Sequence, residues 1–283
     1  MAPRQIPTIR QRRFGVELRR LREAAGMSAP TAAGLLGSDR TMISNIEAGR
    51  FGISEERLRR LASIYECDDS ELIDSLTAMT GGRQAGWWDE YRGKIPPGFL
   101  DVSELEHDAV RLRTAQTAHL PGLFQTEDHA RATFELPVPP LPRLEVELRV
   151  AHRLARQSVI TGDASVPYAG VIHEAALRMR IGGRSIARAQ LRHLLDACER
   201  PNVTLRVIPF SAGGFPLLDS SVLYAEASNP HLDTVQMDAP TGAVFIDSPA
   251  QLANFRTRLD LTEQVALPPT ESREFIHTVA KEL

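Results

Sequence analysis

The sequence predicts an α+β protein in which an all-α unit of five short helices is followed by a larger α+β unit. Three observations lead to this prediction. Through residues 14–79, apolar residues recur at helical spacing in five segments, separated by glycines and by residues that cap helices. Between Tyr168 and Asp247 the pattern changes to short apolar or alternating runs bounded by Gly, Pro and Asn, which is typical of strands. The length of 283 residues is sufficient for two domains with separate cores.

The first two expected helices lie on either side of Gly26, which ends the first of them. Ser28 is a good cap for the second, over residues 29–36, because its hydroxyl can accept a hydrogen bond from the first turn. Pro30 is tolerated in that turn, where its missing N–H would have no helical partner. The first helix is predicted from apolar residues at spacings of four, three and four: Phe14, Leu18, Leu21 and Ala25.

Glycines also end the second and third helices, at Gly37 and Gly49. Either Ser38 or Asp39 can cap the third helix, residues 40–48. A fourth helix is expected after a Ser54 cap and a fifth over residues 70–79. Their buried residues are predicted to be Leu58, Leu61, Ala62, Tyr65, Leu72, Ile73 and Leu76.

Two short helices joined by a tight, glycine-containing turn form the arrangement that presents a recognition helix to the major groove of DNA. The run LRRLREAAGMS…AAGLLGSDRTMISNIEAGR resembles the helix-turn-helix of the phage Cro and repressor family, also called the xenobiotic-response-element family. The matching positions are Arg22 four residues before Gly26, Ala33, Gly37, and Ile46-Glu47 with Gly49.

The resemblance implies that Arg22 and Glu47 form an internal salt bridge, so these two residues are assigned to architecture. It places base-reading positions at Arg40, Thr41 and Asn45. Side-chain chemistry agrees, because Arg pairs well with guanine, Asn pairs with adenine, and the methyl group of Thr or Met can contact that of thymine. The complete DNA-binding surface is expected to be Ser38, Asp39, Arg40, Thr41, Met42, Ser44, Asn45 and Arg50.

One position departs from the family pattern: Ala29 replaces a glutamine that contacts phosphate. Residues 1–13 are expected to form a basic arm, disordered without DNA, whose arginines replace that contact: Arg4, Arg10, Arg12 and Arg13. Charge supports a nucleic-acid partner, since residues 1–60 carry +6 and the remainder −9, to give the net −3. For the charge alone, the alternative is a solvated arginine-rich helix face. For the domain, the alternative is that it has kept the fold, lost its DNA affinity and serves protein docking.

The second part of the chain is expected to begin near Gly82, after a domain at residues 14–80. A linker is predicted at residues 81–100, and an α+β regulatory or partner-binding domain at 101–283. Its helices are predicted at 102–116, 128–133, 144–158, 187–198, 249–265 and 271–283, and its strands at 169–172, 204–209, 221–225, 234–237 and 243–246. The inner face of helix 144–158 is predicted to be Leu148, Ala151, Leu154 and Ala155. Trp87, Trp88 and Tyr91 are either a partner or ligand surface, or a hydrophobic contact of the linker.

A second resemblance covers this part. The phrases LPGLFQTEDHARA, RLARQSVI, HEAALRMRIGG and QLRHLLDACERPNVTLRVIPFSAGG resemble actinobacterial regulators that join such a helix-turn-helix to a domain of unassigned function. Some of these are termed Scr1-family antitoxin-like regulators. The resemblance implies pairing with a small protein encoded nearby, and it implies no chemistry.

No catalytic site is expected. His173-Glu174 is a weak acid–base candidate because neighbouring residues on a strand point to opposite faces. Asp219, Ser220 and Ser221 lack a nucleophile motif, and the double glycines at 81, 182 and 213 lack phosphate-loop spacing. The chain has two cysteines, Cys67 and Cys198, too far apart in sequence for a zinc motif, and neither a membrane span nor a secretory signal. We therefore expect no enzyme, cofactor or metal.

The sequence thus predicts a cytoplasmic, sequence-specific transcriptional regulator, repressor or activator, that binds a double-stranded DNA operator as a homodimer. Its acidic C-terminal domain is expected to sense a signal through a small protein or, as the second choice, a small molecule. Dimerisation is expected because one recognition helix reads only a few base pairs. The alternative is an antitoxin-like protein that masks a small neighbouring-gene protein and uses DNA binding for autoregulation.

Overall fold

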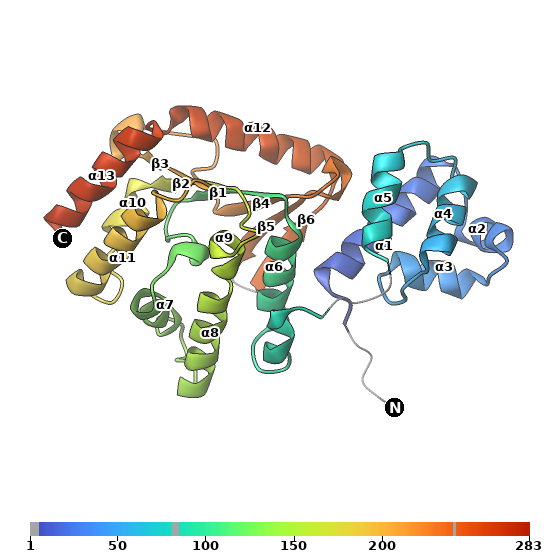
Figure 1. The fold of residues 1–283 in the computed structure, drawn as a ribbon, viewed down its shortest axis with the longest axis horizontal. Helices are drawn as coiled ribbons and strands as arrows, with labels where there is room; N and C mark the ends of the chain where they lie inside the picture. The colour runs from blue at the N-terminus through green and yellow to red at the C-terminus, as the bar shows by residue number, and fades with distance from the viewer. Residues whose placement is uncertain (1–5, 81–84, 240–241) are drawn as a thin grey trace. The chain divides into compact units, whose positions relative to one another are not determined.

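The computed structural model of the chain describes residues 6–80, 85–239 and 242–283. Two compact units are present (Figure 1). The first comprises Met1–Asp89 together with Ala227–Asp233, and the second comprises Glu90–Glu226 together with Thr234–Leu283. The α+β class is confirmed, because the first unit is helical and the second contains a six-stranded sheet with helices.

The first unit contains the five expected helices: α1 (Ile9–Ala24), α2 (Ala29–Leu36), α3 (Arg40–Glu47), α4 (Glu55–Ile64) and α5 (Ser70–Ala78). Each begins at a residue whose side chain accepts a backbone N–H of the first turn. Ser28 and Ser54 act as the sequence predicts, and Asp39 caps α3. Of the predicted apolar residues in α4 and α5, Ile73 alone is only half-buried.

Two glycines allow α1 and the chain after α3 to approach closely. A Cβ atom at Gly15 would lie 2.4 Å from the carbonyl oxygen of Glu47. A Cβ atom at Gly49 would lie 2.7 Å from the carbonyl oxygen of Gln11, and Gly49 also has a φ of +69°, which favours glycine. The packing of α1 against α3 therefore requires glycine at both positions.

The basic arm expected over residues 1–13 is shorter than predicted, because α1 begins at Ile9. Thr8 starts the helix with a capping box to Gln11, and Ile9 is buried. Three of the four arm arginines consequently have intramolecular partners. Arg10 donates to the carbonyl of Ala78 (2.7 Å), Arg12 to that of Pro7 (2.6 Å), and the buried Arg13 pairs with Glu17 (3.2 Å). Arg4 lies outside the described residues.

The segment Ala227–Asp233 belongs to the first unit although it is distant in sequence from the helices. Leu232 is 6% exposed and lies in the same hydrophobic core as Leu18 of α1. The Arg13 guanidinium donates to the main-chain carbonyl of Asp233 (3.4 Å) and to that of His231. These contacts help to cover the buried arginine, in addition to its ion pair with Glu17.

The second unit is built on one sheet with strand order β3-β2-β1-β4-β5-β6. Strand β2 pairs in parallel with β1 and with β3. The pairs β1–β4, β4–β5 and β5–β6 are antiparallel. The strands are β1 (Arg111–Gln116), β2 (Tyr168–His173), β3 (Val203–Ile208), β4 (Val222–Glu226), β5 (Thr234–Ala239) and β6 (Gly242–Ile246).

Helices cover both faces of this sheet. The helix α12 (Pro249–Val265) packs on one face, through Leu252, Phe255 and Leu259. The opposite face carries α6 (Pro97–Asp108), α11 (Arg184–Ala197) and α13 (Pro269–Glu282) (Figure 1). The remaining helices are α7 (Glu127–Phe134), α8 (Arg143–Ala155), α9 (Ser158–Thr161) and α10 (Glu174–Arg178). No helix among residues 6–80, 85–239 and 242–283 is long and apolar enough to cross a membrane.

Three predictions for this unit are wrong. The helix expected over 102–116 ends at Asp108, and β1 follows as a central strand. Arg113 of this strand is only 5% exposed, because it is paired with Asp260 (2.7 Å) and Glu263 (2.8 Å) of α12. A charged residue at a buried position does not fit the apolar pattern expected of a central strand, so the strand was not predicted. The inner face of α8 is Val146, Val150 and His152, whereas Ala151 is exposed and Leu148, Leu154 and Ala155 are only half-buried. The linker expected up to residue 100 is shorter, because α6 begins at Pro97.

Candidate nucleic-acid interface

The helix-turn-helix is formed by α2, α3 and the three residues between them. Gly37 ends α2 in the left-handed region, with a φ of 69°. The backbone N–H of Ser38 donates to the carbonyl of Ala33 (2.8 Å), and the Asp39 carboxylate accepts the N–H of Met42 (2.8 Å). These bonds fix the turn and thus the direction in which α3 leaves it.

The third helix has two chemically different faces. Ile43 and Ile46 are 1% and 2% exposed and anchor it to the core of the unit. On the other side Arg40, Thr41 and Ser44 are exposed, and their side chains form no hydrogen bond or ion pair with any described residue. This face therefore offers a row of available donors and acceptors on a rigid element.

The remaining predicted DNA-binding residues lie at the edges of this face. Asn45 and Met42 are half-buried, and the Asn45 side-chain oxygen lies 3.5 Å from Nη1 of the exposed Arg50. Ser38 is half-buried in the turn. The Asp39 carboxylate already has a structural role as the cap of α3. The structure thus brings the predicted residues together on α3 and its two ends.

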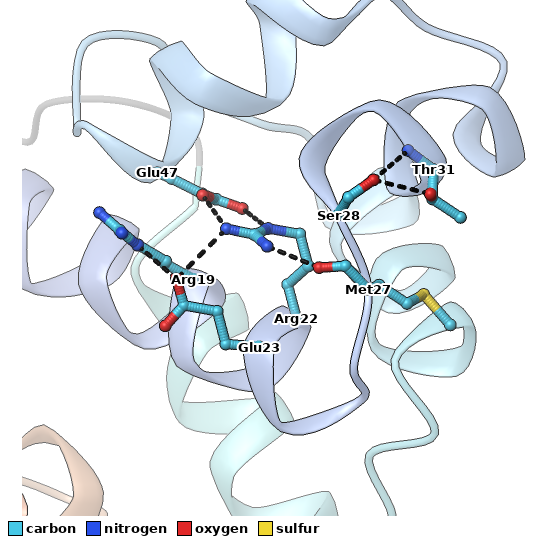
Figure 2. A network of polar contacts seen from close by, with 7 residues as sticks. All are labelled: Arg19, Arg22, Glu23, Met27, Ser28, Thr31 and Glu47. Carbon is cyan, nitrogen blue, oxygen red and sulfur yellow. Dashed lines mark hydrogen bonds and ion pairs between the residues drawn. The ribbon is translucent and has the colours of Figure 1, made fainter.

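Arg22 of α1 and Glu47 of α3 form a two-pronged ion pair (Figure 2). Arg22 Nε lies 2.6 Å from Glu47 Oε1 and Nη2 lies 2.9 Å from Oε2, while Nη1 donates to the carbonyl of Met27 (2.7 Å). Both side chains are nearly buried, at 10% and 9% exposed. All three nitrogens of the guanidinium are therefore engaged within the domain.

The ion pair also has an effect on its surroundings. The hydrogen bond to Glu47 raises the pKa of Arg22, so the guanidinium stays charged. Burial, followed by the negative charge of Glu47, raises the pKa of Tyr65 to about 12. Tyr65 is consequently neutral at pH 7, and the charges at this place in the core are those of Arg22 and Glu47.

The start of α2 carries two exposed hydroxyls. Ser28 Oγ and Thr31 Oγ1 lie 2.7 Å apart, and Ser28 also accepts the N–H of Thr31 (Figure 2). Ala29 stands between them in sequence, at the position where the family resemblance expects a phosphate-contacting glutamine. The sequence did not single out these hydroxyls, although the capping role of Ser28 was evident from it.

The aromatic residues of the expected linker do not form an open surface. Trp88 is 3% and Tyr91 9% exposed, so both are core residues. Trp87 is half-buried and contacts Trp88 edge to face, with ring centroids 5.8 Å apart. The Tyr91 ring contacts His152 at 5.1 Å in the second unit. Of the two interpretations of these residues, burial favours the hydrophobic contact for Trp88 and Tyr91 over a partner or ligand surface.

The catalytic candidates have structural partners. His173 Nδ1 accepts the N–H of Ala175 (3.3 Å) and caps α10, and Glu174 accepts the N–H of Phe210 (2.8 Å). The hydroxyl of Ser220 donates to Asp219 (3.1 Å), and that of Ser221 accepts the N–H of Thr117 (3.3 Å). Both cysteines, Cys67 and Cys198, are free and half-buried. The hydrogen-bonded side chains therefore cap a helix, as His173 does, or join segments of the chain, as Glu174 and Ser221 do.

Comparison with known families agrees with the two units. Residues 13–74 match the model described as "Helix-turn-helix domain". Residues 99–278, more than half of the chain, match the model described as "Domain of unknown function (DUF5753)". The chain belongs to the DUF5753 family. The DUF5753 region runs from α6 into α13, so it contains the whole sheet. No curated protein and no solved structure matches the chain.

Proposed function

We propose that this DUF5753 protein is a sequence-specific DNA-binding transcriptional regulator that inserts α3 into the major groove. The observation that carries the proposal is the exposed face of α3, where Arg40, Thr41 and Ser44 have no partners among the described residues. These side chains form one row on a helix whose other face is fixed by Ile43 and Ile46.

The chemistry of this row suits base edges. Arg40, at the first turn of α3, has the two-pronged donor that fits guanine, and Asn45 fits adenine. The hydroxyls of Ser28 and Thr31 at the exposed start of α2 are suited to a phosphate oxygen, which would replace the missing glutamine contact. Arg50, exposed beyond the end of α3, adds a cation for the backbone.

The regulator acts as a homodimer in this proposal, since one recognition helix reads too few base pairs to give operator affinity by itself. The DUF5753 domain, which carries the acidic part of the sequence, serves as the regulatory or partner-binding domain. The resemblance to actinobacterial regulators of the Cro and repressor type supports this arrangement. The proposed role involves neither catalysis nor a cofactor.

The proposal is tested by replacing Arg40 or Asn45 with alanine. We expect each change to weaken operator binding by about 1–3 kcal/mol, because a base contact is lost, and to leave binding to random DNA nearly unchanged. Genomic fragments bound by the wild-type protein supply the operator, and titration in a band-shift assay at fixed salt measures both affinities.

The matched control is Arg59→Ala on α4, which removes the same charge from an arginine paired with Glu55 (2.9 Å) and Asp74 (3.0 Å). This variant should keep operator selectivity. If Arg40→Ala and Arg59→Ala reduce the affinity for operator and random DNA equally, Arg40 only adds charge and α3 does not read bases.

A second candidate role is antitoxin-like binding of a small protein encoded beside the gene. It is favoured by exposed apolar residues in the segment after α7 and in the first turn of α8, where Leu136 is 65%, Val138 94% and Leu144 71% exposed. Co-expression with that small protein should give a stoichiometric complex in gel filtration, weakened by Val138→Asp and unaffected by Val244→Asp on β6. Absence of a complex, or equal weakening by both variants, would remove this candidate.

A further inference from the structure

Buried nitrogen atoms without a hydrogen-bond partner gather on α7 and α8 of the DUF5753 domain. Within the described residues they include both ring nitrogens of His129 and the Nε atoms of Arg149 and Arg153. Folded proteins leave few buried polar atoms unpaired, because each has lost its bond to water. The two helices pack directly on each other through Ala130, Val146 and Val150. Such a group of atoms on adjacent helices points to a site that a ligand completes.

The three arginines of this region differ in how their charge is balanced. Arg156 binds Glu106 through Nε (2.9 Å) and Nη2 (2.6 Å), and Arg149 pairs with Glu145. Arg153 has only neutral partners: its Nη1 donates to the side-chain oxygen of Gln125 (2.5 Å), and its Cζ lies 4.5 Å from the centre of the Phe134 ring. No carboxylate of a described residue lies within ion-pairing distance of it.

The unpaired part of Arg153 is the edge formed by Nε and Nη2, neither of which has a hydrogen-bond partner among the described residues, and of the two Nε is buried. This is the edge with which Arg156 holds Glu106 and Arg22 holds Glu47. Its two parallel N–H groups match the spacing of two oxygens on a carboxylate or a phosphate. The same chain thus shows twice what this edge binds.

The electrostatics of the neighbourhood agree with an unbalanced cation. Burial, and then the charge of Arg156, lower the pKa of Arg153 to about 9, against the opposing charges of Asp238 and Glu106, so it is still protonated at neutral pH. Burial and the charge of Arg153 lower the pKa of His129 to about 4, which keeps that ring neutral. Burial also lowers the pKa of His119, against the opposing effect of Asp238. An anion bound beside Arg153 would relieve this positive field.

A ligand would approach Arg153 from its Nη2 side, because Nε is buried. Arg153 is half-buried rather than enclosed, and the side chain of His119 is 36% exposed. Gly122 lies beside both arginines: a Cβ atom there would be 3.5 Å from Arg153 Cδ and 3.5 Å from Arg156 Nη1. A side chain at residue 122 would therefore lie against both arginines.

We propose that the DUF5753 domain binds a small anionic molecule, through its carboxylate or phosphate group, on the Nε–Nη2 edge of Arg153. Arg156 contributes charge, and Gln125, 1% exposed and held by the carbonyl of Leu120 (2.8 Å), orients the Arg153 guanidinium. The site lies wholly in the second unit and goes beyond the proposed role in DNA binding. Its test requires no DNA, so its outcome is independent of that proposal.

The test measures the melting temperature of the full chain with inorganic phosphate, with succinate, and with sodium chloride at equal ionic strength. Phosphate and succinate are the two probes, one for each source of the anionic group. We expect at least one of them to raise the melting temperature, by about 3–6 °C at ten times its Kd, and chloride to have no such effect. A response to phosphate alone indicates a phosphate ester as the natural ligand, and a response to succinate alone a carboxylate.

Arg153→Met keeps the apolar stem and removes the charge. This variant should melt no lower than the wild type without ligand, because a partly desolvated cation is gone, and should lose the response to the ion. The control Arg188→Met, an exposed arginine of α11, should respond like the wild type. A merely structural Arg153 would instead give a large fall in melting temperature with the ion response unchanged.

A second pair of variants covers the case in which Arg153→Met does not fold. Gly122→Asp places a carboxylate beside both arginines within the chain, so it should raise the melting temperature and abolish the ion response. Gly122→Asn has the same shape without the charge and should not raise it. The proposal is overturned if neither ion stabilises the wild type more than chloride does, or if the Arg153 and Gly122→Asp variants respond like the wild type.

Discussion

Replacing Glu47 with alanine is expected to lower the stability of the helix-turn-helix unit by about 3–5 kcal/mol. The substitution leaves the nearly buried guanidinium of Arg22 without its two oxygens, which lie at 2.6 and 2.9 Å. The contact of Arg22 with the Met27 carbonyl remains, but it carries no balancing charge. Urea unfolding of the full chain, followed by the loss of helical circular dichroism, measures this change as a decrease in the free energy of unfolding of the helix-turn-helix unit.

The matched control is Glu23→Ala, on the same helix as Arg22. Glu23 pairs with Arg19 at 2.7 Å and lies 3.6 Å from Nη2 of Arg22 (Figure 2). The side chains of Arg19 and Glu23 are both more than half exposed, so these contacts contribute little. This variant should unfold close to the wild type. If Glu47→Ala unfolds normally and instead loses operator binding, Glu47 contacts DNA and the architectural assignment is wrong.

The elements of the first unit could be predicted because their signals are local. A cap such as Ser28 or Ser54 satisfies backbone groups three residues away, and Gly37 ends a helix by its own φ, so short windows of sequence carry the information. The orientation of α3 was equally accessible, since Ile43 and Ile46 fix its buried face. The residues proposed to read bases then follow as the opposite face.

Features that depend on distant partners were not predictable in this way. Arg113 looks like a surface residue until Asp260 and Glu263 arrive from α12 to pair with it inside the sheet. Arg13 looks like part of a basic arm until residues 227–233 cover it. Gly15 shows no sequence signal at all, because its small size matters only for the approach of Glu47. The predicted inner face of α8 failed for the same reason, since its buried side includes a histidine.

Two buried histidines of the DUF5753 domain should make its stability depend steeply on pH. His129 is 2% exposed with no hydrogen-bond partner for its ring among the described residues, and burial, then Arg153, lower its pKa to about 4. His152 is fully buried beside Ser103 (3.0 Å), and burial, then the charges of Arg156 and Arg153, lower its pKa to about 3. Both rings are therefore neutral in the folded chain near pH 7.

The direction of the effect follows from where the protons bind. In the unfolded chain each histidine has its ordinary pKa of about 6.5. As the pH falls below that value, the unfolded state therefore binds protons that the folded state does not bind, and the unfolded state is stabilised relative to the folded one. The stabilisation is fully present above that pH and is lost progressively toward about pH 4 for His129 and about pH 3 for His152. Between about pH 7 and pH 5 each ring should lower the free energy of unfolding by about 2 kcal/mol.

His129→Leu should remove its share of this dependence, because leucine has a similar size and no proton to bind. The free energy of unfolding of the variant, measured by urea titration at a series of pH values, should fall less steeply than that of the wild type between pH 7 and about pH 5. His277→Leu, at an exposed position of α13, is the control and should leave the slope unchanged. Equal slopes for His129→Leu and the wild type would mean that the His129 ring takes up a proton in the folded state, with Arg153 too weakly charged or too well screened to prevent it.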